Sequence, residues 1–212
     1  MLKTTIVKDG YPIIAVFLFF GIITAFYAGL SWSTIPFGIA IFLMFFFRNP
    51  ERVIVNDDNI ILAPADGTVM SVTDIYDEEY LQAPATKVVI FLSVFNVHIN
   101  RSPINGEIKY QRYTCGGFKP AYKKAASYEN ERHAVGIENK NIKILVIQVA
   151  GLLARRIVSW VTLGNHMEQG FRYGMIKFGS STELILPKNV IVTVTKGVRT
   201  VGGKTIIGRI EK

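Results

Sequence analysis

The chain has 212 residues, a net charge of +8 and one cysteine, Cys115. A single cysteine excludes an intrachain disulfide and fits a reducing compartment. The length suits one domain with an added segment, and the positive charge suits attraction to anionic lipid. Nucleic acid is not an expected partner, because there is no basic run with interleaved aromatic residues.

The N-terminal quarter is predicted to be a hydrophobic helical hairpin, spanning residues 1–50. No Asp, Glu, Lys or Arg occurs in residues 11–47. Residues 11–30 are long enough, at 20 residues, to cross a hydrocarbon core of about 30 Å. After a polar break, "SWSTIP", residues 37–47 form a shorter apolar run with Pro36 at its first turn. Whether this second run spans or re-enters the membrane stays open.

Cationic residues flank the hairpin on both outer sides. Lys3 and Lys8 precede it, Arg48 and Arg52 follow it, and the connection is uncharged. This pattern predicts that both ends face the cytoplasm, so the remaining domain lies on the cytoplasmic side of the cell membrane. The alternative of a hairpin buried in a protein core is disfavoured by the unbroken apolar length.

Residues 51–212 are predicted to be mainly β, within an α+β class, and to form a compact barrel or sandwich. The runs typical of strands are 59–75, 86–95, 104–114, 142–151 and 190–198. The polar stretch 117–132, interrupted by Pro120, is predicted to be a loop or a short helix. No long amphipathic helix is expected after residue 50.

Two segments could supply polar catalytic groups. Asp66 lies in "APADGTV", where Asp-Gly commonly makes a turn; alternatively, Asp66 orients a histidine in a catalytic triad. His98 lies in "FNVHINRSPINGE" and could take a proton near neutral pH. Arg101, in the same segment, could bind phosphate or carboxylate with two parallel hydrogen bonds. The histidines His98, His133 and His166 lack metal-ligand spacing, so no metal is predicted.

The stretch "KFGSST", residues 177–182, is predicted to be a turn that precedes a hydrophobic strand. In it the Ser180 hydroxyl follows the carbonyl of Gly179, which has no Cβ to hinder attack. An N-to-O acyl shift followed by elimination would break the chain there. The serine would then become an N-terminal pyruvoyl group. Taken alone, "GSS" is too common to carry this interpretation.

The order of several motifs is far more specific. After the apolar hairpin come "FFFRNPER", "APADGTV", "NVHINRSPINGEI", "NER" and "MIKFGSSTELILP". Together they closely resemble the short bacterial form of phosphatidylserine decarboxylase, a pyruvoyl-dependent membrane enzyme, over nearly the whole chain. The resemblance implies that Ser180 becomes the pyruvoyl cofactor after cleavage from Gly179. The fragments 1–179 and 180–212 would remain associated.

The resemblance also implies a reaction and a set of residues. The pyruvoyl group would form a Schiff base with phosphatidylserine and accept electrons as CO2 leaves, giving phosphatidylethanolamine. Asp66 and His98 match family positions, which makes Asp66–His98–Ser180 a candidate triad. Longer members carry a second histidine where this chain has Arg101, so His98 matches either the triad histidine or one that serves the substrate.

Three alternatives stay open from the residues. The same chemistry could act on another serine phospholipid, such as an archaetidylserine. The chain could instead be a membrane-anchored adaptor with a biotinyl- or lipoyl-like β-sandwich, although no lysine is presented at a hairpin tip. It could also be a purely structural membrane protein. The oligomeric state, including a homo-oligomer, is not predicted by the sequence.

Overall fold

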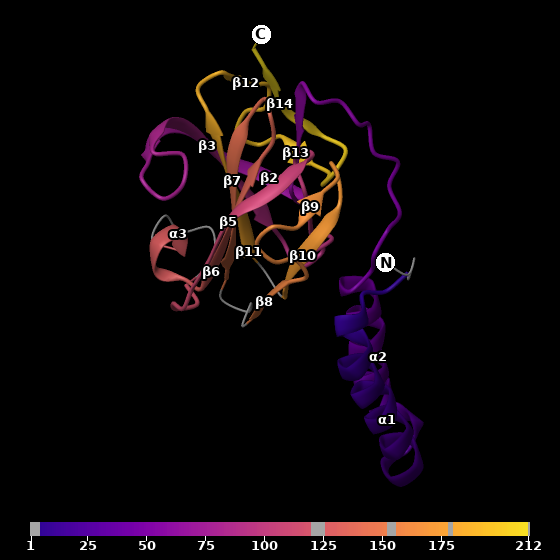
Figure 1. The fold of residues 1–212 in the computed structure, drawn as a ribbon. Helices are drawn as coiled ribbons and strands as arrows, with labels where there is room; N and C mark the ends of the chain where they lie inside the picture. The colour runs from indigo at the N-terminus through magenta and orange to yellow at the C-terminus, as the bar shows by residue number, and fades with distance from the viewer. Residues whose placement is uncertain (1–4, 120–125, 152–155, 178–179, 212) are drawn as a thin grey trace. The chain divides into compact units, whose positions relative to one another are not determined.

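The computed structural model describes residues 5–119, 126–151, 156–177 and 180–211. The chain forms two compact units, Met1–Glu51 and Arg52–Lys212. The first unit is helical, whereas the second is built mainly from β-strands (Figure 1). Each unit has its own internal packing.

The N-terminal unit is a hairpin of two apolar helices. A 3-10 turn, η1 (Lys8–Gly10), leads into α1 (Tyr11–Ala28), and one residue separates α1 from α2 (Leu30–Phe46). That one residue, Gly29, has a φ of +87°, a conformation that glycine adopts without the strain an L side chain would bring. The predicted helical hairpin is therefore confirmed.

The second helix is longer than predicted, and the predicted position of Pro36 is wrong. The residues "SWSTIP" belong to α2, so Pro36 lies inside the helix and not at its first turn. The hydroxyls of Ser33 and Thr34 donate to backbone carbonyls three residues earlier, at 2.8 and 2.7 Å. These polar side chains are thus satisfied within the helix and do not break it.

The first helical segment is the longer and the more apolar of the pair. Together η1 and α1 form a segment of 21 residues, Lys8–Ala28, with a mean hydropathy of 2.1. Among the described helices, it alone is long and apolar enough to cross a membrane by length and composition. Large apolar side chains along it are exposed, including Phe26 at 82%. This segment could anchor the protein to a membrane.

The second unit contains a curled sheet of eight described strands, each antiparallel to its neighbours. In spatial order they are β13 (Arg199–Thr200), β2 (Gly67–Asp77), β3 (Ala83–Leu92), β11 (Ser180–Pro187), β7 (Lys143–Ala150), β6 (Arg132–Glu138), β5 (Gly106–Thr114) and β9 (His166–Met167). The predicted mainly β class is confirmed, and β11 lies inside the sheet.

Two smaller antiparallel sheets accompany the large one (Figure 1). One has the order β1 (Ile60–Leu62), β14 (Ile206–Ile210), β12 (Val190–Val192); the other has the order β4 (Ile99–Arg101), β10 (Arg172–Lys177), β8 (Arg156–Ser159). The second of these matters for function, because β10 and β4 carry the segments next to Ser180 and His98.

Each predicted strand run contains at least one observed strand. The prediction for 117–132 is met in its described part by a short helix, α3 (Ala126–Glu129). None of the predicted strand runs covers β6, which is buried along most of its length between β5 and β7. Strand β7 follows β6 closely in the chain, whereas β5 ends well before it, so the placement of β6 between them depends on a pairing that is not local.

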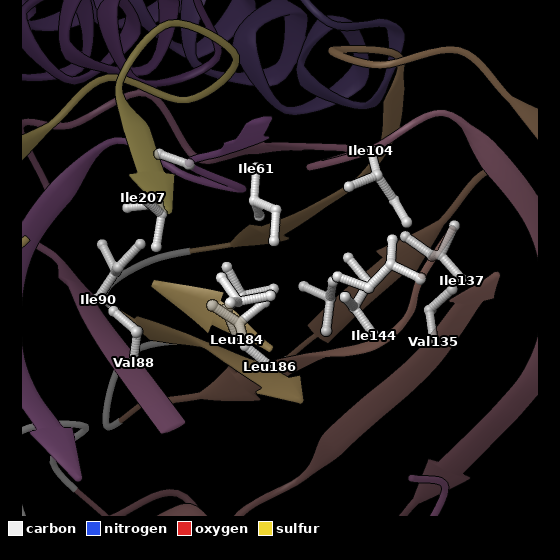
Figure 2. Packing of buried hydrophobic residues seen from close by; sticks show 14 of the residues in the cluster. Ile61, Val88, Ile90, Ile104, Val135, Ile137, Ile144, Leu184, Leu186 and Ile207 are labelled. Atoms are coloured by element: carbon white, nitrogen blue, oxygen red, sulfur yellow. The ribbon is translucent and has the colours of Figure 1, made fainter. Parts of the chain in front are cut away.

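The main core lies on one face of the large sheet. Figure 2 shows Leu184 and Leu186 of β11 among side chains from β3, β6 and β7, with Ile61 and Ile207 of a small sheet above them. The opposite face of β11 packs in a second cluster, which includes Ile185. Burial on both faces makes β11 one of the most enclosed strands of the unit.

Removing a core side chain from β11 should destabilise the second unit. Leu184 is fully buried, so Leu184→Ala should lower the free energy of unfolding by about 2–5 kcal/mol through lost burial and the cavity left behind. Urea unfolding followed by circular dichroism measures this. The control Ile191→Ala changes a side chain that is 55% exposed and should cost about 0.5 kcal/mol or less. Equal losses would contradict this description of the core.

Candidate active site

Ser180 is the first residue of β11 and is completely buried. It pairs with Leu92 of β3 on one side and with Ala150 of β7 on the other. Its hydroxyl forms no hydrogen bond with any described residue. A buried polar group without a partner is costly and commonly marks a functional position. The predicted turn is wrong for residues 180–182, which are strand residues; Gly179 lies outside the described part of the chain.

His98 is also completely buried, and a short turn after β3 positions it. The side-chain oxygen of Asn96 accepts hydrogen bonds from the backbone N–H and the hydroxyl of Ser93, both at 2.9 Å. The backbone carbonyl of Asn96 lies 3.0 Å from His98 Nδ1. Because a carbonyl can only accept, Nδ1 carries a proton, and when the ring is neutral its lone pair lies on Nε2.

Two contacts tie the His98 segment to the strands next to Ser180. The N–H of Ile176, in β10, donates to the carbonyl of His98 at 3.2 Å. The amide of Asn100, in β4, donates to the hydroxyl of Thr182, in β11, at 2.8 Å. Asn100 and Thr182 lie two residues after His98 and Ser180. The structure therefore brings the His98 and Ser180 segments together.

Asp66 has a different partner from the one predicted. Its two oxygens accept bidentate hydrogen bonds from Arg52 at 2.7 and 2.8 Å, and the N–H of Gly202 donates to it at 2.7 Å. Arg52 also donates to the Gly202 carbonyl. No hydrogen bond of Asp66 within the described residues goes to His98. The Asp–His contact of the candidate triad is thus absent here, and the roles of these residues remain predictions.

Arg101 lies in the same charged cluster as Asp66. It is buried and donates to the carbonyl of Gly170 at 3.1 Å. Burial lowers the pKa of Arg101 to about 10, assisted by repulsion from Arg52 and Arg172 and opposed by attraction to Asp66. The cluster contains three arginines and one carboxylate, so its net charge is positive; its members are Arg52, Arg101, Arg172 and Asp66.

A cavity of about 410 Å³ with a mixed polar and apolar lining connects Asp66 with the turn that precedes His98. Its lining includes Asp66, Ser93, Asn96 and Arg199. The cavity therefore borders the arginine–carboxylate cluster and also the residue that orients His98. A small charged molecule could reach both from this side.

Comparison with known proteins assigns the chain to a family. A sequence model of the phosphatidylserine decarboxylase family matches residues 39–208, most of the chain. The chain belongs to the phosphatidylserine decarboxylase family. Members of this family are carboxy-lyases, which disfavours the adaptor and structural alternatives.

Individual relatives agree with this assignment over nearly their whole length. The phosphatidylserine decarboxylase proenzyme of Carboxydothermus hydrogenoformans is 47% identical over 192 residues, covering 90% of this chain and 88% of the relative. The proenzyme of Symbiobacterium thermophilum is 40% identical over 215 residues, covering 100% and 99%. That of Geotalea uraniireducens is 41% identical over 210 residues, covering 97% of each.

The roles of two site residues, Arg52 and Asn96, are not predicted from the sequence. Arg52 belongs to "RNPER", where its charge suggests only a flank of the apolar segment; its pairing with Asp66 spans 14 positions. Asn96 lies beside His98 in the sequence, but its two structural roles depend on the turn geometry. The position of Arg52 at the end of the motif "FFFRNPER" is the one signal for it in the sequence.

A second buried histidine lies behind the site. His133 Nδ1 is 3.0 Å from Gln148 Oε1, and its Nε2 is 2.9 Å from Gln111 Nε2. Gln148 Nε2 donates to Asn100 Oδ1 at 2.8 Å. Burial lowers the pKa of His133 below its ordinary value of 6.5, and the hydrogen bond to Gln148 opposes this shift. His133 is thus held neutral inside a polar network.

This neutral histidine should make stability depend on pH. The unfolded chain protonates His133 near pH 6.5, whereas the folded protein resists protonation, so stability is full above that pH and falls as the pH is lowered through it. His133→Asn, which retains an N–H donor near Nδ1, should flatten the fall in melting temperature between about pH 7.5 and about pH 5. His166→Asn, at an exposed histidine, should retain it. An unchanged slope in His133→Asn would contradict the prediction.

Proposed function

We propose that this chain is a proenzyme that cleaves itself before Ser180 and then decarboxylates phosphatidylserine to phosphatidylethanolamine. The observation that carries the proposal is the buried Ser180 hydroxyl, which has no hydrogen-bond partner among the described residues. Membership in a family whose relatives are named proenzymes supports it. The products of cleavage would be fragments 1–179 and 180–212, held together by the pairing of β11.

Self-cleavage uses the chain's own atoms. The Ser180 oxygen attacks the carbonyl carbon of Gly179 while a base takes the hydroxyl proton, and the peptide C–N bond breaks to give an ester and a free amine. After the base passes the hydroxyl proton to the new amine, it removes the α-proton of residue 180, and the bond between Cβ of residue 180 and the ester oxygen breaks. This releases the carboxylate of Gly179 and leaves dehydroalanine. Addition of water and loss of ammonia give the pyruvoyl group.

His98 is the leading candidate for the base. Its Nδ1–H is held by the Asn96 carbonyl, which leaves the lone pair of Nε2 to accept a proton. In this arrangement a backbone carbonyl orients the imidazole, a role that an aspartate has in hydrolase triads. The alternative, that His98 returns a proton to the substrate carbon after CO2 leaves, uses the same ring nitrogen. Each role needs the neutral ring to exchange protons at Nε2.

Asp66 is proposed to act through the arginine cluster. By pairing with Arg52 at low exposure it offsets part of the positive charge that surrounds Arg101. The remaining positive charge would attract the phosphate and carboxylate of a phosphatidylserine head group in the adjoining cavity. Arg101 is thus proposed to contribute to substrate binding through the field of the cluster.

The buried Ser180 position fits a pyruvoyl group, because the hydroxyl has no described partner to lose on conversion. When formed, the group supplies an electron sink for the pair left by departing CO2. Residue 180 lies between Leu92 and Ala150, which are both completely buried, so the group would form in an enclosed position of the sheet. No external cofactor is required.

The N-terminal helices are proposed to hold the enzyme at its lipid substrate. The segment Lys8–Ala28 has the length and hydropathy of a membrane span, and its apolar side chains are exposed. Cationic residues at both outer ends of the hairpin favour a cytoplasmic location for the catalytic unit. A lipid with two acyl chains could then reach the site without leaving the bilayer.

Replacement of Ser180 tests the proposed function. Ser180→Ala removes the attacking oxygen, so this variant should remain one chain on denaturing gels and form no phosphatidylethanolamine from phosphatidylserine vesicles. Ser181→Ala is a matched control, because the side chain of Ser181 is also buried but points to the opposite face of β11. It should still be cleaved. Two fragments from Ser180→Ala would overturn the proposal.

Replacement of His98 tests the base. His98→Ala should slow self-cleavage by about 10²-fold or more, the usual contribution of a positioned base. The rate is measured as the conversion of newly synthesised chain into two fragments. The control His166→Ala, at an exposed histidine, should be cleaved at the normal rate. Normal cleavage of His98→Ala, with activity alone lost, would assign His98 to the substrate step instead.

A further inference from the structure

A continuous chain of side-chain hydrogen bonds crosses the interior behind Ser180. The amide nitrogen of Gln111 can only donate, so His133 Nε2 must accept from it. The proton of the neutral ring is therefore on Nδ1, which donates to Gln148 Oε1. Gln148 Nε2 donates to Asn100 Oδ1, and Asn100 Nδ2 donates to Thr182 Oγ1, both at 2.8 Å. Every donor in this series of hydrogen bonds points toward β11.

This direction of hydrogen-bond donation allows only one orientation for the side-chain amides of Gln148 and Asn100. Rotating the amide of Gln148 would place its NH2 group against the Nδ1–H of His133 and its oxygen against the oxygen of Asn100. Rotating the amide of Asn100 would place its NH2 group against that of Gln148. Such donor–donor contacts in a buried site leave polar groups unsatisfied at a considerable cost. His133 thus sets the orientation of Asn100 through Gln148.

The hydrogen-bonded side chains also occupy defined positions on adjacent strands. Thr182, Gln148 and His133 are directly opposite one another on the adjacent strands β11, β7 and β6. Side chains alternate along a strand, so Ser180, Thr182 and the core residue Leu184 share one face of β11. The polar row therefore lies between the apolar core and Ser180.

Among the residues of this hydrogen-bond series, only Asn100 comes from another sheet. It belongs to β4, whereas Thr182 belongs to the large sheet. Since Asn100 follows His98 by two residues and Thr182 follows Ser180 by two, their hydrogen bond joins the segments of the proposed base and nucleophile. Both residues are completely buried.

We propose that Asn100 and Thr182 are positioning residues for self-cleavage, because the hydrogen bond between them holds the His98 segment against the Ser180 segment. The inference rests on the proposed function of Ser180 and His98. The competing explanation is that Thr182 only fills space in a buried strand. The two explanations make opposite predictions for a pair of conservative variants.

Thr182→Val keeps the branched shape of threonine but removes the hydroxyl, whereas Thr182→Ser keeps the hydroxyl but removes the methyl group. Positioning through the hydrogen bond predicts that Thr182→Val slows self-cleavage about tenfold or more, and that Thr182→Ser stays within about threefold of the wild type. A space-filling role predicts the reverse. The rate is followed by pulse–chase of the full chain, synthesised in a cell-free system with phospholipid vesicles.

The wild-type chain and two further variants complete the experiment. If the wild type is not cleaved, the proposed function fails; if it is cleaved and Thr182→Val keeps its rate, the positioning role alone fails. Similar slowing in both threonine variants also overturns the inference. Thr193→Val, which removes a threonine hydroxyl from an exposed hydrogen bond, should leave the rate unchanged.

Asn100→Leu tests the same hydrogen bond by removing its donor. If the two residues act through one bond, the double variant Asn100→Leu/Thr182→Val should be cleaved no more than about threefold more slowly than the slower single variant. Multiplied effects would mean that the residues act independently and would contradict the inference. Melting temperatures of uncleaved Ser180→Ala backgrounds carrying each change report whether the variant folds.

Discussion

Strand β11 is hydrogen-bonded on both sides, to β3 and to β7, and the site depends on this double pairing. The pairing holds Ser180 beside Leu92 at the end of β3, and the turn that leaves β3 carries His98. Strand β10, which precedes Ser180 in the chain, contacts the same segment because the N–H of Ile176 donates to the carbonyl of His98. Sheet register therefore determines which polar groups can meet at residue 180.

Two separate polar systems lie near Ser180. One is charged: Arg52 pairs with Asp66, and Arg101 experiences the charges of Arg52, Arg172 and Asp66, next to a cavity that Asp66 lines. The other is neutral and runs from His133 to Thr182. The charged system suits attraction of an anionic head group, whereas the neutral one suits fixed orientation, because neutral amides have a low cost of burial once all are satisfied. Such a division would separate substrate attraction from control of the cleaved bond.

Several elements could be predicted from the sequence because their signals are local. The apolar length of residues 11–30 and the alternating runs in the second unit correspond to helices and strands. The turn predicted at Ser180 was wrong because its strand character comes from β3 and β7, which are distant in sequence. Likewise, the Arg52 partner of Asp66 and the partners of His133 depend on tertiary packing. Local patterns predict Ser180 as the candidate reactive residue, but they do not predict its environment.

The central claim, that residue 180 becomes the prosthetic group, is tested most directly by the intact mass of the purified wild-type protein under denaturing conditions, with and without borohydride. We predict two fragments that divide between residues 179 and 180, with the smaller one blocked at its N-terminus and increased in mass by reduction. A single chain of 23.7 kDa with an intact peptide bond before Ser180 would contradict the claim.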